Sequence, residues 1–455
     1  MQSAIQFSSV ISSAFSDVDS LAWLLVITTV LVGGCVALYS LFYFPRDTRD
    51  PSDTTRTTRR FWLLFWLLQI TLNSLWLSSS LFTAYIALEL LTVIAINMII
   101  LDRQPKSLTA GRRYLYTALC SSIFLLAGLV GLYYQYGSLR FATLGELLNN
   151  NMTTQLALLS ITLGLVIKTA IVPMHRWLPQ AHGVALAPIS ALHAALVTKA
   201  SFYILARMWL EAGTDLMPIS IAQGLGALGA LSIGYGGYKA LQQRNIKMLI
   251  AYSTVAQLGY LLLLFPLATG TSPAATNAAW QGSMLHLIAH AFAKSAMFLS
   301  IGTLVAILGS KHITALGGTS MRMPISLMAF GLASVSLMGL PPSGGFNAKW
   351  LLLQSALLSG QWHWVMVLLG GSLLTATYIF KVFSLSFDQR AIDAGRSQLA
   401  PVSWGLELTA LLLAAIAILL GFIAEVPEAL DLQLTAAELS STALNPAPLS
   451  PEVPS

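Results

Sequence analysis

The sequence predicts an all-α polytopic membrane protein of about twelve transmembrane helices with two inverted five-helix repeats, and three observations support this prediction. Hydrophobic residues make up 56% of the 455 residues and charged residues only 9%, whereas a soluble domain carries about 25% charged residues. The mean hydropathy of +0.73 is far too high for a water-soluble globule. The apolar residues also gather in runs of about 20, the length that a helix needs to cross a bilayer.

These runs define the expected spans in order along the chain. Residues 1–19 lack a basic region and are expected to form an exposed N-terminal segment, not a signal peptide. The transmembrane domain is expected over 20–424. The tail over 425–455, acidic and Pro-rich at its end, is expected to be exposed. The expected spans are 20–44, 61–78, 80–101, 114–136, 155–177, 186–209, 220–238, 246–268, 280–308, 323–358, 363–386 and 402–424.

The distribution of positive charge predicts the orientation of these spans. Of the 24 Lys and Arg residues, seventeen lie in segments on one side, five lie inside spans, and only Arg140 and Arg207 lie on the other side. Basic residues concentrate on the cytoplasmic side of membrane proteins. We therefore expect a protein of the bacterial inner membrane with both termini on the non-cytoplasmic side. The cytoplasmic basic residues then account for the net charge of +6, so we do not expect a nucleic-acid partner.

Cysteine and nucleotide chemistry are excluded. The only cysteines, Cys35 and Cys120, both lie in apolar runs. Two thiols are too few for a disulfide framework or for a zinc or iron–sulfur thiolate cluster. The sequence contains no phosphate-cradling loop or dinucleotide fingerprint. We expect no cofactor and no metal in this chain, and no redox or hydrolytic site of its own.

Two spans are expected to be interrupted by proline, which removes a backbone donor. Pro173 interrupts the fifth span, and Pro341 and Pro342, followed by Gly344, interrupt the tenth. Interrupted spans in corresponding halves of a chain are typical of transporters, because free backbone groups there meet ions or water. The breaks lie five spans apart, an odd offset, so the second half is expected to be inverted relative to the first. The expected repeats are about 61–211 and about 220–387.

Five lysines lie inside the expected spans, where each one costs about 3 kcal/mol on insertion scales. Lys381 lies near the cytoplasmic end of its span, and snorkelling to the interface is as good an explanation for it as function. The remaining lysines lie too deep for that explanation, so we expect them to have a function. They are Lys168, Lys199, Lys294 and Lys349.

Glu89 is the only acid deep in the apolar region, whereas Glu407 lies close to the start of its span and is expected near the interface. Burial disfavours the charged form of a lone acid or a lone lysine, but a pair stabilises both charges. We therefore expect Glu89 to meet one of the lysines. Such a pair is either part of a proton path or an ion pair that only fixes helix packing.

His286, His290 and Lys294 are spaced i, i+4 and i+8, which confines them to an arc of about 80° on a helix. Histidine titrates near neutral pH and can relay protons. Two alternatives stay open: each imidazole bonds to a backbone carbonyl, or the pair binds a metal, although no third ligand has suitable spacing. The predicted proton line at mid-membrane consists of Glu89, Lys168, Lys199, His286, His290, Lys294 and Lys349.

These residues resemble the antiporter-like membrane subunits shared by respiratory complex I, the Mrp Na⁺/H⁺ antiporters and membrane-bound hydrogenases. The most specific stretches are KTAIVPMHRWLPQAH at 168–182 and APISALHAALVTK at 187–199. Further matches are LIAYSTVAQLGY at 249–260, the segment 286–294, and GLPPSGGF at 339–346. The resemblance covers about residues 20–424.

The resemblance implies two inverted five-helix bundles, each with one broken helix. It implies that Glu89 pairs with Lys168 and that Lys349, where some members have Glu, lies at the exit side of the path. It implies no cofactor, and partners that are other membrane subunits. Against the about fourteen spans of a typical member, we expect this chain to lack the first two helices and the long lateral helix of one complex I subunit, which puts its contacts with neighbours in question. The implied connecting relay is Lys199, His286 and His290.

We therefore predict a proton-translocating subunit of a multisubunit complex, either a redox-driven pump or a cation/proton antiporter. Sodium is less expected in this chain, because it prefers oxygen ligands and only one carboxylate lies deep. One alternative is the proton-conducting subunit of an energy-coupled inorganic-carbon uptake complex, whose partner is a soluble zinc-bearing protein. Another alternative is a structural scaffold with a degenerate path.

Overall fold

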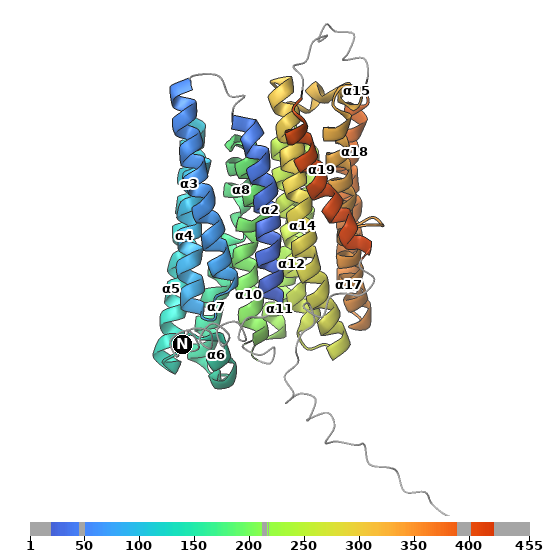
Figure 1. The fold of residues 1–455 in the computed structure, drawn as a ribbon. Coiled ribbons are helices and arrows are strands. Elements are labelled where there is room, and N and C mark those ends of the chain that lie inside the picture. The colour runs from blue at the N-terminus through green and yellow to red at the C-terminus, as the bar shows by residue number, and fades with distance from the viewer. Residues whose placement is uncertain (1–19, 45–50, 212–215, 217, 389–401, 423–455) are drawn as a thin grey trace, which may run out of the picture.

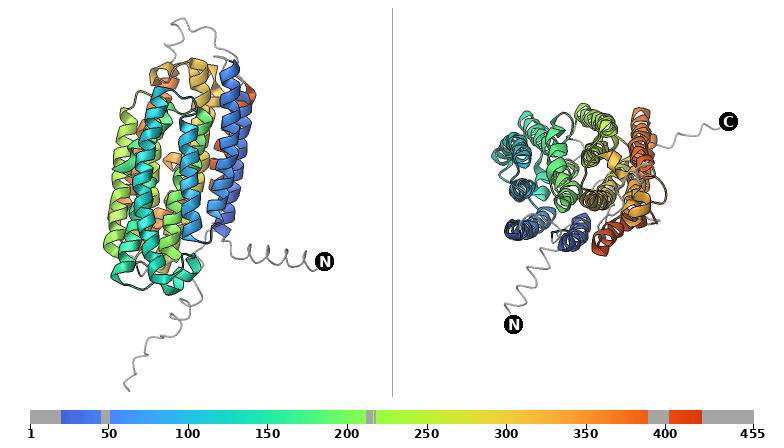
Figure 2. Two further views of the ribbon diagram at one scale, coloured as in Figure 1. Left: turned by 90° about the vertical axis from the view of Figure 1, so that its left-hand side faces the viewer. Right: turned by 90° about the horizontal axis from the view of Figure 1, so that it is seen from above.

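The computed structural model describes residues 20–44, 51–211, 216, 218–388 and 402–422. Within these ranges the chain forms helices and no extended strand. The long helices run roughly side by side in one bundle (Figures 1 and 2). The expected N-terminal segment 1–19 and the tail 425–455 lie outside the described residues.

The first half of the bundle ends with a helix that changes geometry in its middle. Its elements are α2 (Ser20–Tyr43), α3 (Pro51–Trp76), α4 (Leu81–Ile99), α5 (Pro105–Tyr136), α6 (Phe141–Leu147), α7 (Met152–Lys168), η2 (Met174–Arg176), α8 (Trp177–Val184), α9 (Ala187–Leu192), η3 (His193–Val197) and α10 (Thr198–Glu211).

The second half contains the longest helix and a second broken one. Its elements are α11 (Ile219–Gln242), α12 (Ile246–Leu262), α13 (Leu264–Ala268), α14 (Pro273–Leu308), η5 (Ile313–Leu316), α15 (Thr319–Arg322), α16 (Pro324–Met338), α17 (Gly344–Leu358), α18 (Trp362–Ser386), α19 (Trp404–Leu419) and η7 (Leu420–Phe422).

Each expected span coincides with a helix or with a broken helix, so the prediction of an all-α polytopic membrane protein is confirmed. Among the described residues, nine helical segments are long and apolar enough to cross a membrane without help. The apolar helices Met152–Lys168 and Pro324–Met338 are shorter, and each is one half of a broken span. The expected inverted repeat stays a prediction.

The structure corrects the starts of three helices. Helix α3 begins ten residues before the expected span, α5 nine and α14 seven. Proline occupies an early position in α5 and α14, where its missing N–H costs no hydrogen bond. Hydropathy reports only the part of a helix that lies in hydrocarbon, so it misses polar turns beyond the boundary.

Burial separates central from peripheral helices. The apolar windows of Ala187–Trp209, Ile246–Ala268 and Pro273–Leu308 are 100%, 89% and 78% buried inside the protein. The outer helices instead expose large apolar side chains such as Ile123 and Phe380, as lipid contact requires. Most of the deep basic residues predicted from sequence lie on the central helices.

The first break separates α7 from α8. Helix α7 ends at Lys168, because Pro173 cannot donate a backbone hydrogen bond to the carbonyl of Thr169, four residues earlier, and its ring would collide with that carbonyl in a continuous helix. Ala170 has a φ of +62° and is fully buried. A non-glycine residue in this left-handed region is strained, and such strain persists only where surrounding packing enforces it.

The second break separates α16 from α17 at the expected residues. Helix α16 ends at Met338, Pro341 and Pro342 lie in the connection, and Gly344 begins α17. Gly345 has no room for a side chain, because a Cβ there would collide with the carbonyl oxygen of Ser336. The glycines therefore let α17 start directly against the end of α16.

Candidate functional site

Glu89 and Lys168 form an ion pair between α4 and α7. Lys168 Nζ lies 2.7 Å from Glu89 Oε1. The Lys168 side chain is 3% exposed and that of Glu89 is 29% exposed. Ser122 on α5 donates to the same carboxylate oxygen at 2.7 Å and lies 3.5 Å from Lys168 Nζ. The acid that was expected to meet a lysine thus meets Lys168, where three helices converge.

Small residues bring α5 and α7 close enough for this convergence. A Cβ at Gly128 would contact the carbonyl of Ala157, and one at Gly164 would contact that of Ser121. Ser121 also donates to the carbonyl of Gly164 at 2.7 Å. Backbones that approach this closely are typical of helix packing in membranes. The close packing holds the lysine of α7 in reach of its partners.

Lys199 is fully buried and lies just after a π-helical turn, η3. Its ammonium donates to the carbonyl of Ala194, five residues earlier. A π-helix widens the backbone by one residue, and such turns are frequent at functional sites. No residue of His193–Val197 predicts this turn, because the segment contains neither proline nor glycine.

His286 and His290 stack on one another along α14, with ring centroids 5.6 Å apart. His286 Nε2 lies 3.2 Å from the carbonyl of Gln257, so the alternative of a carbonyl-bound imidazole holds for this ring. Both ring nitrogens of His290 are buried and have no hydrogen-bond partner among the described residues. The alternative therefore fails for His290.

Lys294 lies one turn further along α14 and is fully buried. Its ammonium donates to Ser253 Oγ at 2.5 Å and to the carbonyl of Ile250 at 3.2 Å. Both partners belong to α12. Lys294 is thus held by neutral dipoles and not by a carboxylate.

Lys349 is bound at the end of the second broken helix. Its ammonium donates to the carbonyls of Leu337 at 2.9 Å and Met338 at 3.3 Å, the last residues of α16. It also donates to Ser372 Oγ at 3.1 Å and lies 4.4 Å from the ring centroid of Tyr260. The free carbonyls of a helix C-terminus carry partial negative charge, which stabilises a cation there.

Five buried basic residues from α10, α14 and α17 form one electrostatic group, which we call the basic cluster. Lys199, Lys294, His286 and Lys349 all lie near enough to act electrostatically on His290, which makes His290 its centre. Across the described part of the chain, no hydrogen bond joins Lys168 to the cluster. Lys168 instead contacts Glu89 and Ser122, so we describe the Glu89–Lys168 pair apart from the cluster. The basic cluster consists of Lys199, His286, His290, Lys294 and Lys349.

His182 on α8 is a neighbour of the cluster that sequence reasoning did not single out. Its ring stacks on Phe298 of α14 at 4.8 Å between centroids, and its Nε2 has no partner among the described residues. The charges of Lys199 and Lys294 act on it. The sequence feature that could have identified His182 is its place as the last residue of the KTAIVPMHRWLPQAH stretch, although it lies beyond the expected span 155–177.

Two further lysines continue from His182 toward the protein surface. Lys247 acts electrostatically on His182 and donates to the carbonyl of Ala185 at 2.9 Å. Lys311, in the connection after α14, donates to the carbonyl of Gly183 at 3.2 Å. Partial burial lowers the pKa of Lys311, and the charge of Asp102 opposes that shift.

The remaining charged residues within the spans have structural partners. Lys381 donates to the carbonyls of Leu241 at 2.7 Å and Gln243 at 3.1 Å, so it caps the end of α11. Glu407 is buried and accepts from the backbone N–H of Ser326 at 3.2 Å and from its Oγ at 2.8 Å. Glu407 thus caps the N-terminus of α16 from the first turn of α19, and its expected position near the interface stays a prediction.

The described residues contain no group of three His, Cys, Asp or Glu side chains that could hold a metal ion. Both cysteines lack a disulfide.

Comparison with known proteins gives matches over most of the chain. A family model described as NADH:quinone oxidoreductase/Mrp antiporter, transmembrane, matches residues 78–375, a range that includes Glu89 and Lys349. NADH-quinone oxidoreductase subunit N of Desulforudis audaxviator is 34% identical over 411 residues, which cover 88% of this chain and 79% of the relative. The chloroplastic NAD(P)H-quinone oxidoreductase subunit 5 of Aethionema grandiflorum is 30% identical over 395 residues, 82% of this chain. The match spans only 50% of that longer relative.

Two solved structures share the fold. A chain of the Mrp complex from Dietzia sp. DQ12-45-1b superposes with a TM-score of 0.77 at 21% identity, covering 91% of this chain and 82% of the other. A chain of the membrane-bound sulfane sulfur reductase, an archaeal respiratory membrane complex, superposes with a TM-score of 0.78 at 25% identity. It covers 88% of this chain and 79% of the other.

Proposed function

The chain belongs to the NADH:quinone oxidoreductase/Mrp antiporter transmembrane family, and on that premise we propose that it moves protons across the membrane as one subunit of a larger complex. The family expected from the sequence is thereby confirmed, and the protein is an integral membrane protein. The proton path, the partners and the driving reaction are the proposal.

The observation that supports the proposal most is the basic cluster around His290. Five basic side chains share an apolar interior, and no hydrogen bond or ion pair joins any of them to a carboxylate within the described residues. An unpaired buried charge costs several kcal/mol even after relaxation, so the five groups do not all carry a proton at once. A cluster with fewer protons than sites is the condition under which protons move between neighbours.

In this proposal the Glu89–Lys168 ion pair controls when Lys168 releases its proton. Separating a buried ion pair costs about 3–5 kcal/mol, so it does not open without a driving event. Lys168 is the last residue of α7, directly before the strained turn at Ala170. A movement of this broken helix would shift the lysine away from Glu89 and favour release of its proton toward the cluster.

The side chains of His182, Lys247 and Lys311 support a connection from the cluster to the surface. His182 lies within electrostatic reach of Lys199 and Lys294 on one side and of Lys247 on the other. Lys311 completes the series beyond the end of α14. On the orientation predicted from the positive charges, this connection opens on the cytoplasmic side of a bacterial inner membrane, and both termini lie outside.

The chain supplies no redox chemistry in this proposal. The driving reaction, electron transfer or a cation gradient, belongs to partner subunits. Protons are the transported ion, and the other membrane subunits and the lipid bilayer are the partners.

Proton flux in vesicles tests the proposal. The chain is purified with its partners, reconstituted, and flux is followed with a pH-sensitive dye. Lys168→Ala should reduce flux to background, because the pair loses its proton carrier. Lys239→Ala is the matched control, since Lys239 is partly exposed on α11, lies outside the pair, the cluster and the connection to the surface, and should leave flux unchanged. Wild-type flux through Lys168→Ala would remove the pair from the path.

The proteins that co-purify identify the driving reaction. Redox subunits indicate a pump, and a set of small membrane subunits indicates an antiporter. A single soluble zinc protein would instead favour the inorganic-carbon alternative, with CO₂-dependent growth as its test.

A further inference from the structure

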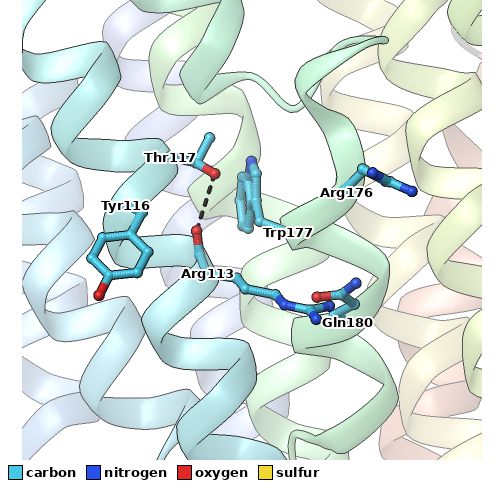
Figure 3. A pocket seen from close by; sticks show the side chains of 6 residues that line it. All are labelled: Arg113, Tyr116, Thr117, Arg176, Trp177 and Gln180. Atoms are coloured by element: carbon cyan, nitrogen blue, oxygen red, sulfur yellow. Dashed lines mark hydrogen bonds between the residues drawn. The ribbon is translucent and has the colours of Figure 1, made fainter.

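A pocket between α5 and the first broken helix lies apart from the proton line. Its volume is about 460 Å³, and it is lined by Arg113, Tyr116 and Thr117 from α5 and by Arg176, Trp177 and Gln180 from η2 and α8. Figure 3 shows the guanidinium of Arg113 beside Gln180, whereas the side chain of Arg176 points away from Trp177 at the edge of the pocket.

The lining is basic and polar, with no acid among its residues. Neither Arg113 nor Arg176 makes an ion pair with a described residue. Thr117 and Gln180 add a hydroxyl and an amide, and the buried Nε1 of Trp177 has no hydrogen-bond partner within the described ranges. The guanidinium of Arg113, with the amide of Gln180 beside it, matches the oxygen atoms of a phosphate group, and Arg176 adds a second positive charge to the lining.

Stacking fixes one wall of the pocket. The rings of Tyr114 and Trp177 lie 3.9 Å apart between centroids and only 6° from parallel, and both residues are buried. The contact joins α5 to α8, so Arg113 and Arg176, each next to one of the stacked rings in sequence, are held in place by it. The pocket is thus built by packed helices and not by a mobile loop.

The length of α5 places the pocket at a membrane boundary. A helix of 32 residues is about 48 Å long, against about 30 Å for the hydrocarbon core. Arg113 is the ninth residue of α5, and no charged residue follows it before the helix ends at Tyr136. Arg113 therefore lies where the headgroups of the bilayer meet the hydrocarbon.

An exposed apolar stripe runs from the pocket along the same helix. Tyr116, Leu119, Ile123, Leu126 and Val130 are all exposed, and their spacing puts them on one face of α5. From Tyr116 to Val130 the stripe extends about 21 Å, longer than the roughly 15 Å thickness of one hydrocarbon leaflet. An acyl chain that begins at the pocket would lie along this stripe.

We propose that this pocket binds the phosphate group of an anionic phospholipid, with an acyl chain along the exposed stripe of α5. Basic pockets between transmembrane helices are suited to anionic lipid headgroups. The apolar stripe at its mouth favours a lipid over a free phosphate ion, which has no acyl chain to bury there. The bound lipid would join α5 to the second half of the broken helix.

Lipid titration of the purified full chain tests the proposal, with binding measured by native mass spectrometry. The probes are phosphatidylglycerol and phosphatidylcholine with the same acyl chains. Phosphatidylglycerol should bind at least about tenfold more tightly, and Arg113→Gln and Arg176→Gln should each weaken its binding about tenfold. Arg112→Gln is the matched control, because Arg112 is exposed beside the pocket and does not line it.

Three results would overturn the proposal: equal binding of both lipids, an equal loss in the Arg112→Gln control, or unchanged binding in both pocket variants. Displacement of phosphatidylglycerol by inorganic phosphate at matched ionic strength would assign the site to a free anion instead. None of these measurements depends on proton flux, so the lipid site and the proposed function succeed or fail separately.

Discussion

Lys168 and Lys349 both lie beside a broken helix, yet they are bound in different ways. Lys168 is paired with the carboxylate of Glu89 at 2.7 Å. Lys349 is bound by two backbone carbonyls of the helix that the break has opened, by Ser372 and by the face of Tyr260. In the first break the negative partner is a side chain on another helix, and in the second it is the broken backbone.

The difference has a consequence for proton transfer. A proton that leaves Lys168 also unmakes an ion pair and leaves the charge of Glu89 without its cation. A proton that leaves Lys349 costs only hydrogen bonds to neutral groups, each worth about 1.5–3 kcal/mol when the donor is charged. The pair is therefore suited to hold a proton until it is driven, and Lys349 to pass one on.

Glu89→Gln should have the largest effect on stability and proton flux, because it removes the negative charge of the Glu89–Lys168 ion pair. Lys168 would remain buried without a counter-ion, at a cost of about 3 kcal/mol in the free energy of unfolding. Thermal unfolding in mild detergent measures this loss, and proton flux should fall with it.

The double variant Glu89→Gln, Lys168→Met is the control for that prediction. It should regain most of the lost stability, since no buried charge remains, but no flux. If Glu89→Gln alone keeps both wild-type stability and wild-type flux, the carboxylate does not control Lys168.

Lys349→Met should have an intermediate effect. Of the two carbonyls that would lose their donor, only the contact with Leu337 is fully buried, and leaving that carbonyl unsatisfied costs about 1–3 kcal/mol. Lys349→Arg keeps donors at this position but does not readily release a proton. We expect the Met variant to lose stability and flux and the Arg variant to lose flux alone. An Arg variant with wild-type flux would make Lys349 a helix cap only.

Lys381→Met should have the smallest effect on stability and proton flux. It separates the role of a lysine as a helix cap from its role in the basic cluster. Lys381 binds two carbonyls at the end of α11, as Lys349 does at the end of α16, but it lies outside the basic cluster. Its loss should cost about 1 kcal/mol in thermal unfolding and leave flux unchanged. A large loss of flux in this variant would show that capping, not position in the cluster, explains both lysines.

Much of this arrangement is predictable from the sequence, because a charged residue within an apolar span is costly and therefore rare. Apolar runs predicted the spans, prolines predicted both breaks, and the cost of burying charge drew attention to Glu89 and the deep lysines. The requirement that a buried charge find a partner predicted that Glu89 meets a lysine, and the family resemblance predicted that this lysine is Lys168. These are local or compositional signals that a single chain carries.

The rest depends on tertiary packing. The π-helical turn at His193–Val197 contains no proline or glycine, so its sequence does not predict it. His182 lies in the short second half of a broken helix, and only the fold brings it against Phe298 and the cluster. Glu407 accepts hydrogen bonds from Ser326 at the start of α16, a partner that only the fold brings to it.

The most direct test of the central claim, that protons pass through the basic cluster, compares two buried histidines. His290 has no hydrogen-bond partner among the described residues and lies at the centre of the cluster. His193 is equally buried, but both its nitrogens meet carbonyls, those of Ile189 at 2.9 Å and Ala95 at 3.1 Å.

The measurement is proton flux in vesicles with His290→Gln or His193→Gln, each first shown by thermal unfolding to be folded. We predict that His290→Gln reduces flux to the background of Lys168→Ala and that His193→Gln retains flux. Wild-type flux through His290→Gln would contradict the account, because the path would then not pass through the centre of the cluster.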